Sequence, residues 1–245
     1  MINHQIVKKN LFNLLLLLLL VQLAACNKSI RGSGHIVQQT LSVDSFHAIE
    51  TNGSFDVQVE QLNAPSGLLL IEADDNIIPV IEARVVNGVL KIQYNTITNI
   101  KTRKTPKIWV NTGRLSRLFI NGSGSIVTNG NRVGDELELR VNGSGDIVTR
   151  YQAQALNASI SGSGTISLSG KALLADCYIS GSGKINGFDF TSEKAKLVLS
   201  GSGNMYCGVE KELDATVSGS GNIYYKGNPT TVRTQISGSG QIIRQ

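Results

Sequence analysis

Aliphatic residues recur at fixed places around a tripeptide that is repeated along the second half of the chain. Gly-Ser-Gly begins at residues 122, 143, 162, 181, 201, 219 and 238, so consecutive copies lie 21, 19, 19, 20, 18 and 19 residues apart. An aliphatic residue stands two positions before every copy: Ile120, Val141, Ile160, Ile179, Leu199, Val217 and Ile236. A near-constant spacing of about 19 residues indicates a repeat architecture.

The segment before each tripeptide alternates between apolar or small residues and mostly polar ones. This period of two predicts a strand with one buried face. Four residues after the first glycine stand Ile126, Ile147, Ile166, Ile185, Met205, Ile223 and Ile242. A second strand, also facing inward, should therefore follow each tripeptide.

A strand, a tight corner, a second strand and a variable loop, repeated about every 19 residues, predict one coil of a parallel β-helix. A β-sandwich is the competing architecture, but its hairpins would not preserve one corner sequence in parallel register. Glycine suits the corner because it allows a positive φ and a close approach of two backbones. The predicted structural corner glycines are Gly122, Gly124, Gly143, Gly145, Gly162, Gly164, Gly181, Gly183, Gly201, Gly203, Gly219, Gly221, Gly238 and Gly240.

The first half of the chain is less regular. A degenerate corner occurs at Asn52-Gly53-Ser54, with Phe55 where the second glycine would be, and Asn87-Gly88 predicts a hairpin. We expect one all-β domain over 36–245, with irregular, longer coils of the same solenoid over 36–115 and regular coils over 116–245. Residues 27–35 are expected to form a short tether.

The N-terminal segment predicts export. Lys8 and Lys9 precede an apolar run that is short for a membrane span, and the run ends in Ala24-Ala25-Cys26. This ending resembles the lipobox of bacterial lipoproteins, which implies a signal peptide over 1–26 and lipidation of Cys26. The alternative is an ordinary signal peptide with an incidental cysteine. Asn27, in place of aspartate, resembles outer-membrane sorting.

Three segments together carry a family resemblance: "FHAIETNGSFDVQVE", "IEADDNIIPVIEARVVNGVLKI" and the repeated "SGSG" followed one residue later by isoleucine. They resemble the bacterial putative auto-transporter adhesin head GIN domain family, over about residues 36–242. The resemblance implies a right-handed parallel β-helix on an exported protein, often a lipoprotein. It implies no catalytic residues.

The charge balance is too mild to imply nucleic-acid binding. The chain has 23 basic and 18 acidic residues; removing 1–26 takes away two lysines, which leaves 21 against 18, or +3. The basic run at 101–107 is expected to be a solvated loop or a protected strand edge, in preference to a phosphate- or glycan-binding site.

The residues that could carry chemistry do not form a recognisable constellation. The Gly-Ser-Gly tripeptides lack the lysine and helix of a phosphate loop and the aspartates of a calcium β-roll, so we expect no cofactor and no metal. His35 and His47 are expected at the surface. We therefore predict a non-enzymatic cell-envelope module with an unidentified glycan or protein ligand. The alternative is a carbohydrate-active enzyme (a polysaccharide lyase or hydrolase) that uses Asp74, Asp75 and Asp146.

Two further expectations concern cysteines and the last coil. Cys177 belongs to an inward column and is expected to be a buried thiol, although a disulfide with Cys207 is an alternative. The chain stops five residues after its last tripeptide. An open coil edge there predicts self-association.

Overall fold

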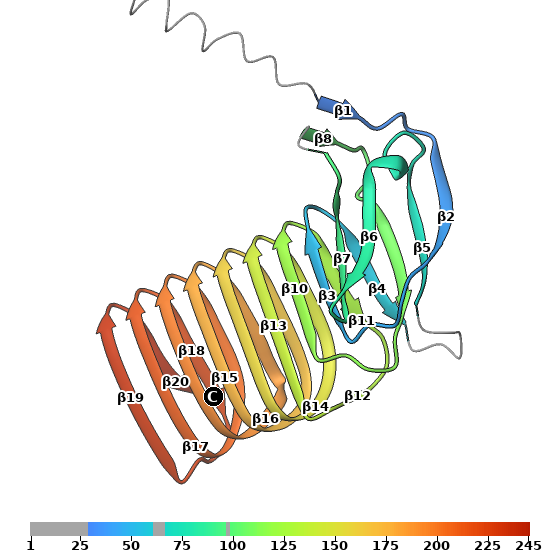
Figure 1. Ribbon diagram of the computed structural model, residues 1–245. Coiled ribbons are helices and arrows are strands. Elements are labelled where there is room, and N and C mark those ends of the chain that lie inside the picture. Colours follow the sequence, from blue (N-terminus) through green and yellow to red (C-terminus); the bar gives the residue numbers. More distant parts are fainter. Residues whose placement is uncertain (1–28, 61–66, 97–98) are drawn as a thin grey trace, which may run out of the picture.

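The computed structural model describes residues 29–60, 67–96 and 99–245, and these fold into a stack of coils with a cap of further strands at the N-terminal end (Figure 1). The coils contain β3 (Ala48–Asn52), β4 (Asp56–Glu60), β10 (Arg117–Gly122), β11 (Ser125–Thr128), β12 (Arg132–Val133), β13 (Glu136–Gly143), β14 (Asp146–Gly162), β15 (Thr165–Gly181), β16 (Lys184–Gly201), β17 (Asn204–Gly219), β18 (Asn222–Lys226), β19 (Thr231–Gly238) and β20 (Gln241–Arg244). Every pairing between successive coils is parallel. The predicted right-handed parallel β-helix is confirmed (Figure 1).

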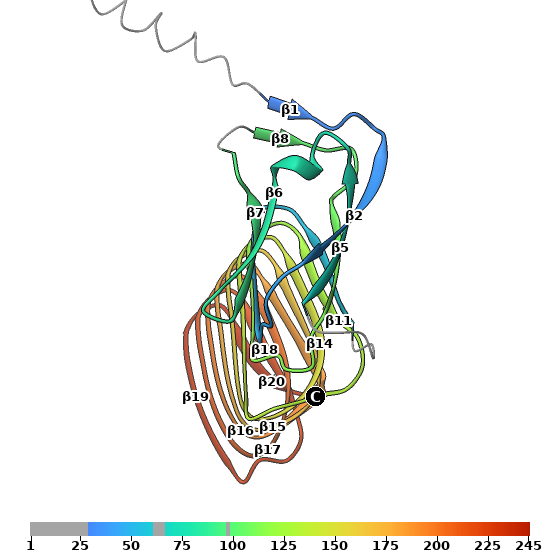
Figure 2. The same cartoon turned by 45° about the vertical axis from the view of Figure 1, so that its right-hand side comes forward.

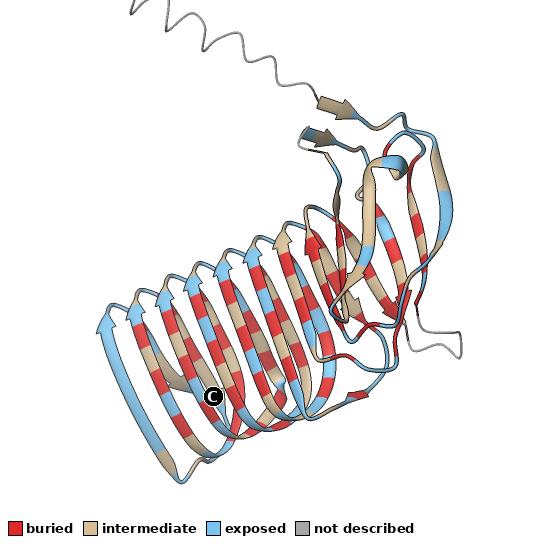
Figure 3. Cartoon of the chain, viewed as in Figure 1, coloured by how far each residue is buried: buried red, intermediate tan, exposed pale blue. Residues whose placement is uncertain are grey.

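The strands of neighbouring coils align the repeat in register. Val141 pairs with Ile160, and Ile160 pairs with Ile179, so the aliphatic residues before each corner form one continuous column. Figure 3 shows the resulting alternation of buried and exposed positions along the strands. Because each coil covers the apolar face of its neighbour, the stability of the stack accumulates along its length.

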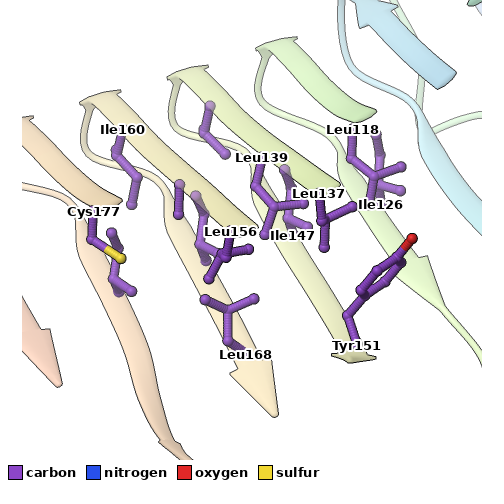
Figure 4. Close-up of a cluster of buried hydrophobic side chains, with 14 of the residues drawn as sticks. Leu118, Ile126, Leu137, Leu139, Ile147, Tyr151, Leu156, Ile160, Leu168 and Cys177 are labelled. Carbon is purple, nitrogen blue, oxygen red and sulfur yellow. The ribbon is translucent and has the colours of Figure 1, made fainter. Parts of the chain in front are cut away.

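The inward columns fill the lumen of the β-helix (Figure 4). One inward column stands two residues before the first glycine of each corner, and another stands four residues after it. Before the last coil, every residue of both columns is buried: Ile120, Val141, Ile160, Ile179, Leu199, Val217, Ile126, Ile147, Ile166, Ile185, Met205 and Ile223. In the last coil, Val232 is 44% exposed and Ile236 is 48% exposed. Among the described residues, β19 pairs only with β17, and β20 pairs only with β18.

The two glycines of each corner meet different requirements. The first glycine has a positive φ, for example +127° at Gly162, which L side chains rarely adopt. The second does not have a positive φ but lies against the coil before it, since a Cβ on Gly164 would stand 2.3 Å from the carbonyl oxygen of Gly145. Both positions therefore exclude any residue with a side chain.

The degenerate corner takes its expected place in the stack. Asn52 pairs with Asn121, so β3 and β4 form a coil directly before the regular ones. The backbone of Phe55 occupies the position of a second glycine, and a Cβ on Gly124 would stand 2.0 Å from its carbonyl oxygen.

The rest of the segment 36–115 differs from the expected longer coils. It contains β2 (Ile36–Ser42), β5 (Leu68–Asp74), the 3₁₀ helix η1 (Ile78–Val80), β6 (Ile81–Val86), β7 (Val89–Tyr94) and β9 (Lys107–Asn111). Strand β5 runs antiparallel to both β2 and β9, and β6 runs antiparallel to β7. The expectation of continuous coils is thus wrong here, because tight turns such as Asn87-Gly88, with φ of 52° and 75°, reverse the chain.

These antiparallel strands cap the N-terminal end of the lumen (Figure 2). β7 pairs with β3, and β9 pairs with β4, so the cap continues the sheets of the first coil. Its buried residues join the core of the coils, among them Leu69, Ile71, Leu90, Ile92, Ile108 and Val110. A capped end is what a repeat stack requires to keep its terminal apolar face from water.

The described part of the expected tether, 29–35, is bound to this cap. β1 (Ser29–Arg31) pairs in parallel with β8 (Asn99–Lys101) in a separate sheet of two strands. Gly32-Ser33-Gly34, a further copy of the tripeptide, is not a coil corner. The amide nitrogen of Gly34 donates to Asp74, and the hydroxyl of Ser33 donates to Asp75, both at 2.6 Å. The same tripeptide thus serves here to attach the start of the chain to the turn after β5.

Among the described residues, no helix has the length and apolarity needed to span a membrane.

We expect Gly164→Ala to lower the free energy of unfolding by about 1–3 kcal/mol, because the added methyl group must displace backbone. Ser163→Ala in the same corner is the matched control, since Ser163 is exposed and should change stability by less than about 0.5 kcal/mol. Urea denaturation followed by circular dichroism measures both. Equal midpoints for the two variants would contradict the close backbone approach.

Candidate functional site

A groove crosses the coils on the side opposite the glycine corners, where each coil returns from its second strand to the next coil. Its volume is about 1190 Å³. The lining comes from the residue before β3, from the segment before β10, from β12, β13 and the two residues between them, and from the middle of β14, β15, β16 and β17. The lining residues are His47, Arg114, Leu115, Ser116, Val133, Gly134, Asp135, Glu136, Tyr151, Gln152, Ala153, Gln154, Gly170, Lys171, Ala172, Leu173, Thr191, Ser192, Glu193 and Glu210. Because several coils contribute, the groove suits an extended ligand.

Two buried polar side chains hold one wall of this groove. Tyr151 donates its hydroxyl hydrogen to the carbonyl oxygen of Leu115, which is a groove residue. Arg132 is 4% exposed, and its guanidinium donates to the carbonyl oxygens of Thr112, Val59 and Glu60 at 3.0–3.2 Å. Since unpaired buried carbonyls are costly, these bonds fix the loop before β10 against the first coils.

The lining combines apolar surface with both charges. Val133 is 75% exposed and Leu173 is 49% exposed, so apolar side chains stand among the polar ones of the lining. Four carboxylates (Asp135, Glu136, Glu193 and Glu210) face the groove together with Arg114 and Lys171. Glu193 is paired with Lys211 at 2.6 Å, and Asp135 accepts a hydrogen bond from Gln154.

A second surface lies on the outer face of the later coils, after the corners. Tyr206 and Tyr224 stack with ring centroids 5.0 Å apart, and Phe188 meets Tyr206 edge to face at the same separation. The ammonium of Lys184 lies 4.9 Å from the ring of Tyr206, and that of Lys226 lies 4.3 Å from Phe188. Such cation–π contacts hold the lysines over the rings.

Sequence reasoning missed this cluster, although part of it was detectable. Tyr206 and Tyr224 are paired partners in β17 and β18, and each follows its tripeptide by three residues. A comparison of outward columns would therefore have aligned them. Phe188 could not have been found, because the register between β16 and β17 shifts between Gly187 and Thr191.

The aspartates considered for catalysis lie outside the groove. Asp74 is buried at the end of β5, where it accepts from the amide nitrogen of Gly34, whereas Asp146 is exposed at the start of β14. The hydrogen bond from Ser33 lowers the pKa of Asp75 below its ordinary value, with a smaller contribution from His35. An aspartate held in its ionised form is poorly suited to act as a general acid.

Both histidines lie at the surface, as expected, and both have partners. Nδ1 of His35 is 3.4 Å from a carboxylate oxygen of Asp75. Nδ1 of His47 is 3.0 Å from the hydroxyl of Ser116, at the edge of the groove. Among residues 29–60, 67–96 and 99–245, no three His, Cys, Asp or Glu side chains are grouped as a metal site would require.

The structure leaves Cys177 and Cys207 as free, buried thiols, so the alternative of a disulfide is not realised. Burial raises the pKa of Cys177 well above its ordinary value, with a further contribution from Cys207, and burial raises the pKa of Cys207 to about 12. The physical reason is that the lumen disfavours the charged thiolate. Cys26, the predicted lipidation site, lies outside the described residues.

The coils and their corner ladders define a parallel β-helix of repeated units, and comparison with known proteins gives the family. The sequence profile of the "Putative auto-transporter adhesin, head GIN domain" family matches residues 45–229, which is more than half of the chain. The chain belongs to this family, and the predicted resemblance is confirmed. No curated protein matches the chain.

Solved structures share the fold. A putative adhesin from Bacteroides fragilis has a TM-score of 0.79 at 24% identity, covering 88% of this chain and 100% of its own. A putative adhesin from Parabacteroides distasonis has a TM-score of 0.72 at 23% identity, covering 89% of this chain and 100% of its own. A putative lipid binding protein from the same species has a TM-score of 0.73 at 27% identity, again covering 89% and 100%.

We expect both thiols to resist Ellman's reagent at pH 8 in a folded chain that lacks residues 1–26, and to react fully after unfolding. The pKa of each thiol is higher in the folded than in the unfolded protein, so raising the pH favours the unfolded state. The free energy of unfolding should therefore keep its full value below pH 9 and fall as the pH rises toward 12. Fast reaction of the folded protein, or a mass that changes on reduction, would contradict buried free thiols.

Proposed function

We propose that the protein is a non-enzymatic binding module of the cell envelope, adhesin-like, and anchored to a membrane by lipid on Cys26. The observation that carries the binding role is the groove of about 1190 Å³ across several coils, with exposed apolar side chains beside charged ones. The family supports an envelope location and a binding role in general terms. Lipidation of Cys26 and a location at the outer membrane are inferred from the N-terminal residues that precede the folded domain.

The ligand of the groove is an extended glycan or a protein segment. Ligand sites combine apolar contact with a few well-placed polar groups, and the lining of the groove has both. Outside the groove, the aromatic and lysine cluster around Tyr206 offers a second contact for a glycan, since aromatic side chains present apolar surface beside polar groups. Although one solved relative is named for lipid binding, the lumen here is filled by buried side chains, so we propose no lipid site inside it.

A polysaccharide-cleaving enzyme is the second candidate, because four carboxylates line the groove. Glycosidases need two carboxyl groups with separate roles, one of them an acid that keeps its proton. Against this role, Glu193 is held by Lys211, and the aspartates at 74, 75 and 146 lie elsewhere. Binding is therefore the better-supported role. Val232 and Ile236 of β19 are about half exposed, so self-association through this strand remains a further prediction.

We expect Leu173→Arg to weaken ligand binding at least about tenfold, because it places a bulky cation in the groove. Leu174→Arg is the matched control, since Leu174 is 50% exposed but does not line the groove. Both variants should unfold at the wild-type temperature. Binding is measured on an array of bacterial and host glycans, followed by titration of the best glycan.

Equal loss in both variants would contradict a role of the groove. Absence of any bound glycan or protein partner, together with turnover of a defined polysaccharide, would overturn the binding role in favour of the enzyme.

We expect cells that express the full chain to incorporate labelled palmitate into this protein, and Cys26→Ser to abolish the label. Cys177→Ser is the matched control, because Cys177 is buried in the lumen and cannot be acylated in the folded protein. Gel fluorography of the immunoprecipitated protein measures the incorporation. Wild-type chain without label would show that the signal peptide is of the ordinary kind.

A further inference from the structure

A group of cations lies at the end of the cap where the chain enters the fold. Arg31 ends β1, Lys101 ends β8, and Arg103 and Lys104 follow in the loop to β9; all four side chains are exposed. Arg31 pairs with Lys101 in the register of the two strands, and the amide nitrogen of Gly32 donates to the carbonyl oxygen of Lys101 at 3.0 Å. We call these four residues the basic end.

The basic end is not neutralised by the residues around it. Within the described part of the chain, none of its four side chains forms an ion pair. The nearby Asp74 and Asp75 accept hydrogen bonds from Gly34 and Ser33, and Asp75 also lies 3.4 Å from His35, so these two carboxylates offset part of the charge and leave an excess of two cations. Lys107 is left out of the group, because it pairs in register with Asp56 on one side and Glu72 on the other.

The two strands that carry the basic end contribute little to the core. No residue of β1 or β8 is buried, and these strands form a sheet separate from that of the coils. Figures 1 and 2 both show β1 and β8 side by side at the far end of the cap, away from the coils. Packing of the core therefore does not account for the charges on them.

The distance to the proposed anchor is short. Ser29 follows Cys26 by three residues, and a fully extended chain advances at most about 3.6 Å per residue, so β1 begins within about 11 Å of a lipidated Cys26. This is close to the screening length of about 8 Å at physiological ionic strength. Exposed cations at this end would lie within reach of charged headgroups.

We propose that the basic end docks on the anionic phosphate headgroups of the membrane that holds the lipid anchor. This inference rests on the proposed lipidation of Cys26. The lipid supplies attachment, and the four cations supply a second contact that fixes the orientation of the rod. With the cap held at the membrane and β1 bound to β8, the coils and their groove point away from the lipid surface.

Vesicle flotation tests the proposal without the lipid. A chain of residues 27–245 keeps the fold, because every strand pairing of the structure is made within residues 29–245. We expect it to float with vesicles of phosphatidylethanolamine and phosphatidylglycerol but not with vesicles of phosphatidylethanolamine and phosphatidylcholine. Binding should fall as salt is raised.

The triple variant K101Q/R103Q/K104Q should bind these vesicles at least about tenfold more weakly, since each basic residue near an anionic surface contributes to the binding free energy. The matched control is R150Q/K196Q/R244Q, which removes the same charge from exposed positions on β14, β16 and β20. The control should bind as the wild type does.

Several results would overturn the proposal. Equal binding by both triple variants would mean that the contact depends on net charge alone. Displacement by inorganic phosphate at a concentration matching the lipid phosphate would indicate a site for free phosphate. No flotation, together with palmitate on Cys26, would leave the anchor standing and remove the docking; absence of palmitate would remove both.

Discussion

The whole structure depends on how closely the backbones of successive coils approach at the glycine corners. The carbonyl oxygen of Gly143 accepts a hydrogen bond from the amide nitrogen of Ser163 at 2.9 Å, and a Cβ on Gly162 would stand 2.3 Å from that same oxygen. A corner that stacks on a preceding one therefore requires glycine on both sides of its central serine. Once it is closed, the strand segments on either side of it run in the same register, and their inward residues meet their equivalents in the next coil.

This constraint explains where the fold is regular and where it varies. The two strands beside the corner are held by the ladder, so their residues stack in uniform columns. The return side of each coil is free to differ, and a register shift between Gly187 and Thr191 appears there. The groove lies on that return side. The variable lining and the constant core thus come from opposite sides of the same coil.

The apolar residues of the lumen are covered to different extents at the two ends of the stack. At the N-terminal end, the antiparallel strands of the cap cover the first coil with residues such as Leu90 and Ile108, both fully buried. At the other end of the described residues, Val232 and Ile236 remain about half exposed. β1 is bound to the cap through its pairing with β8, so only a short segment separates the proposed anchor from the folded domain.

The sequence by itself determined the coils, their period, the inward columns and the corner at Asn52-Gly53-Ser54, because a parallel stack repeats one local pattern of alternation and glycine. Only the tertiary structure decided the antiparallel cap, since its pairings join β2, β5 and β9 across stretches without any repeat. It also decided the surfaces. The groove, the attachment of the tripeptide at 32–34 to Asp74 and the contact of Lys226 with Phe188 bring together residues from separate turns of the chain. No local pattern encodes such proximity, because it depends on the return path of each coil.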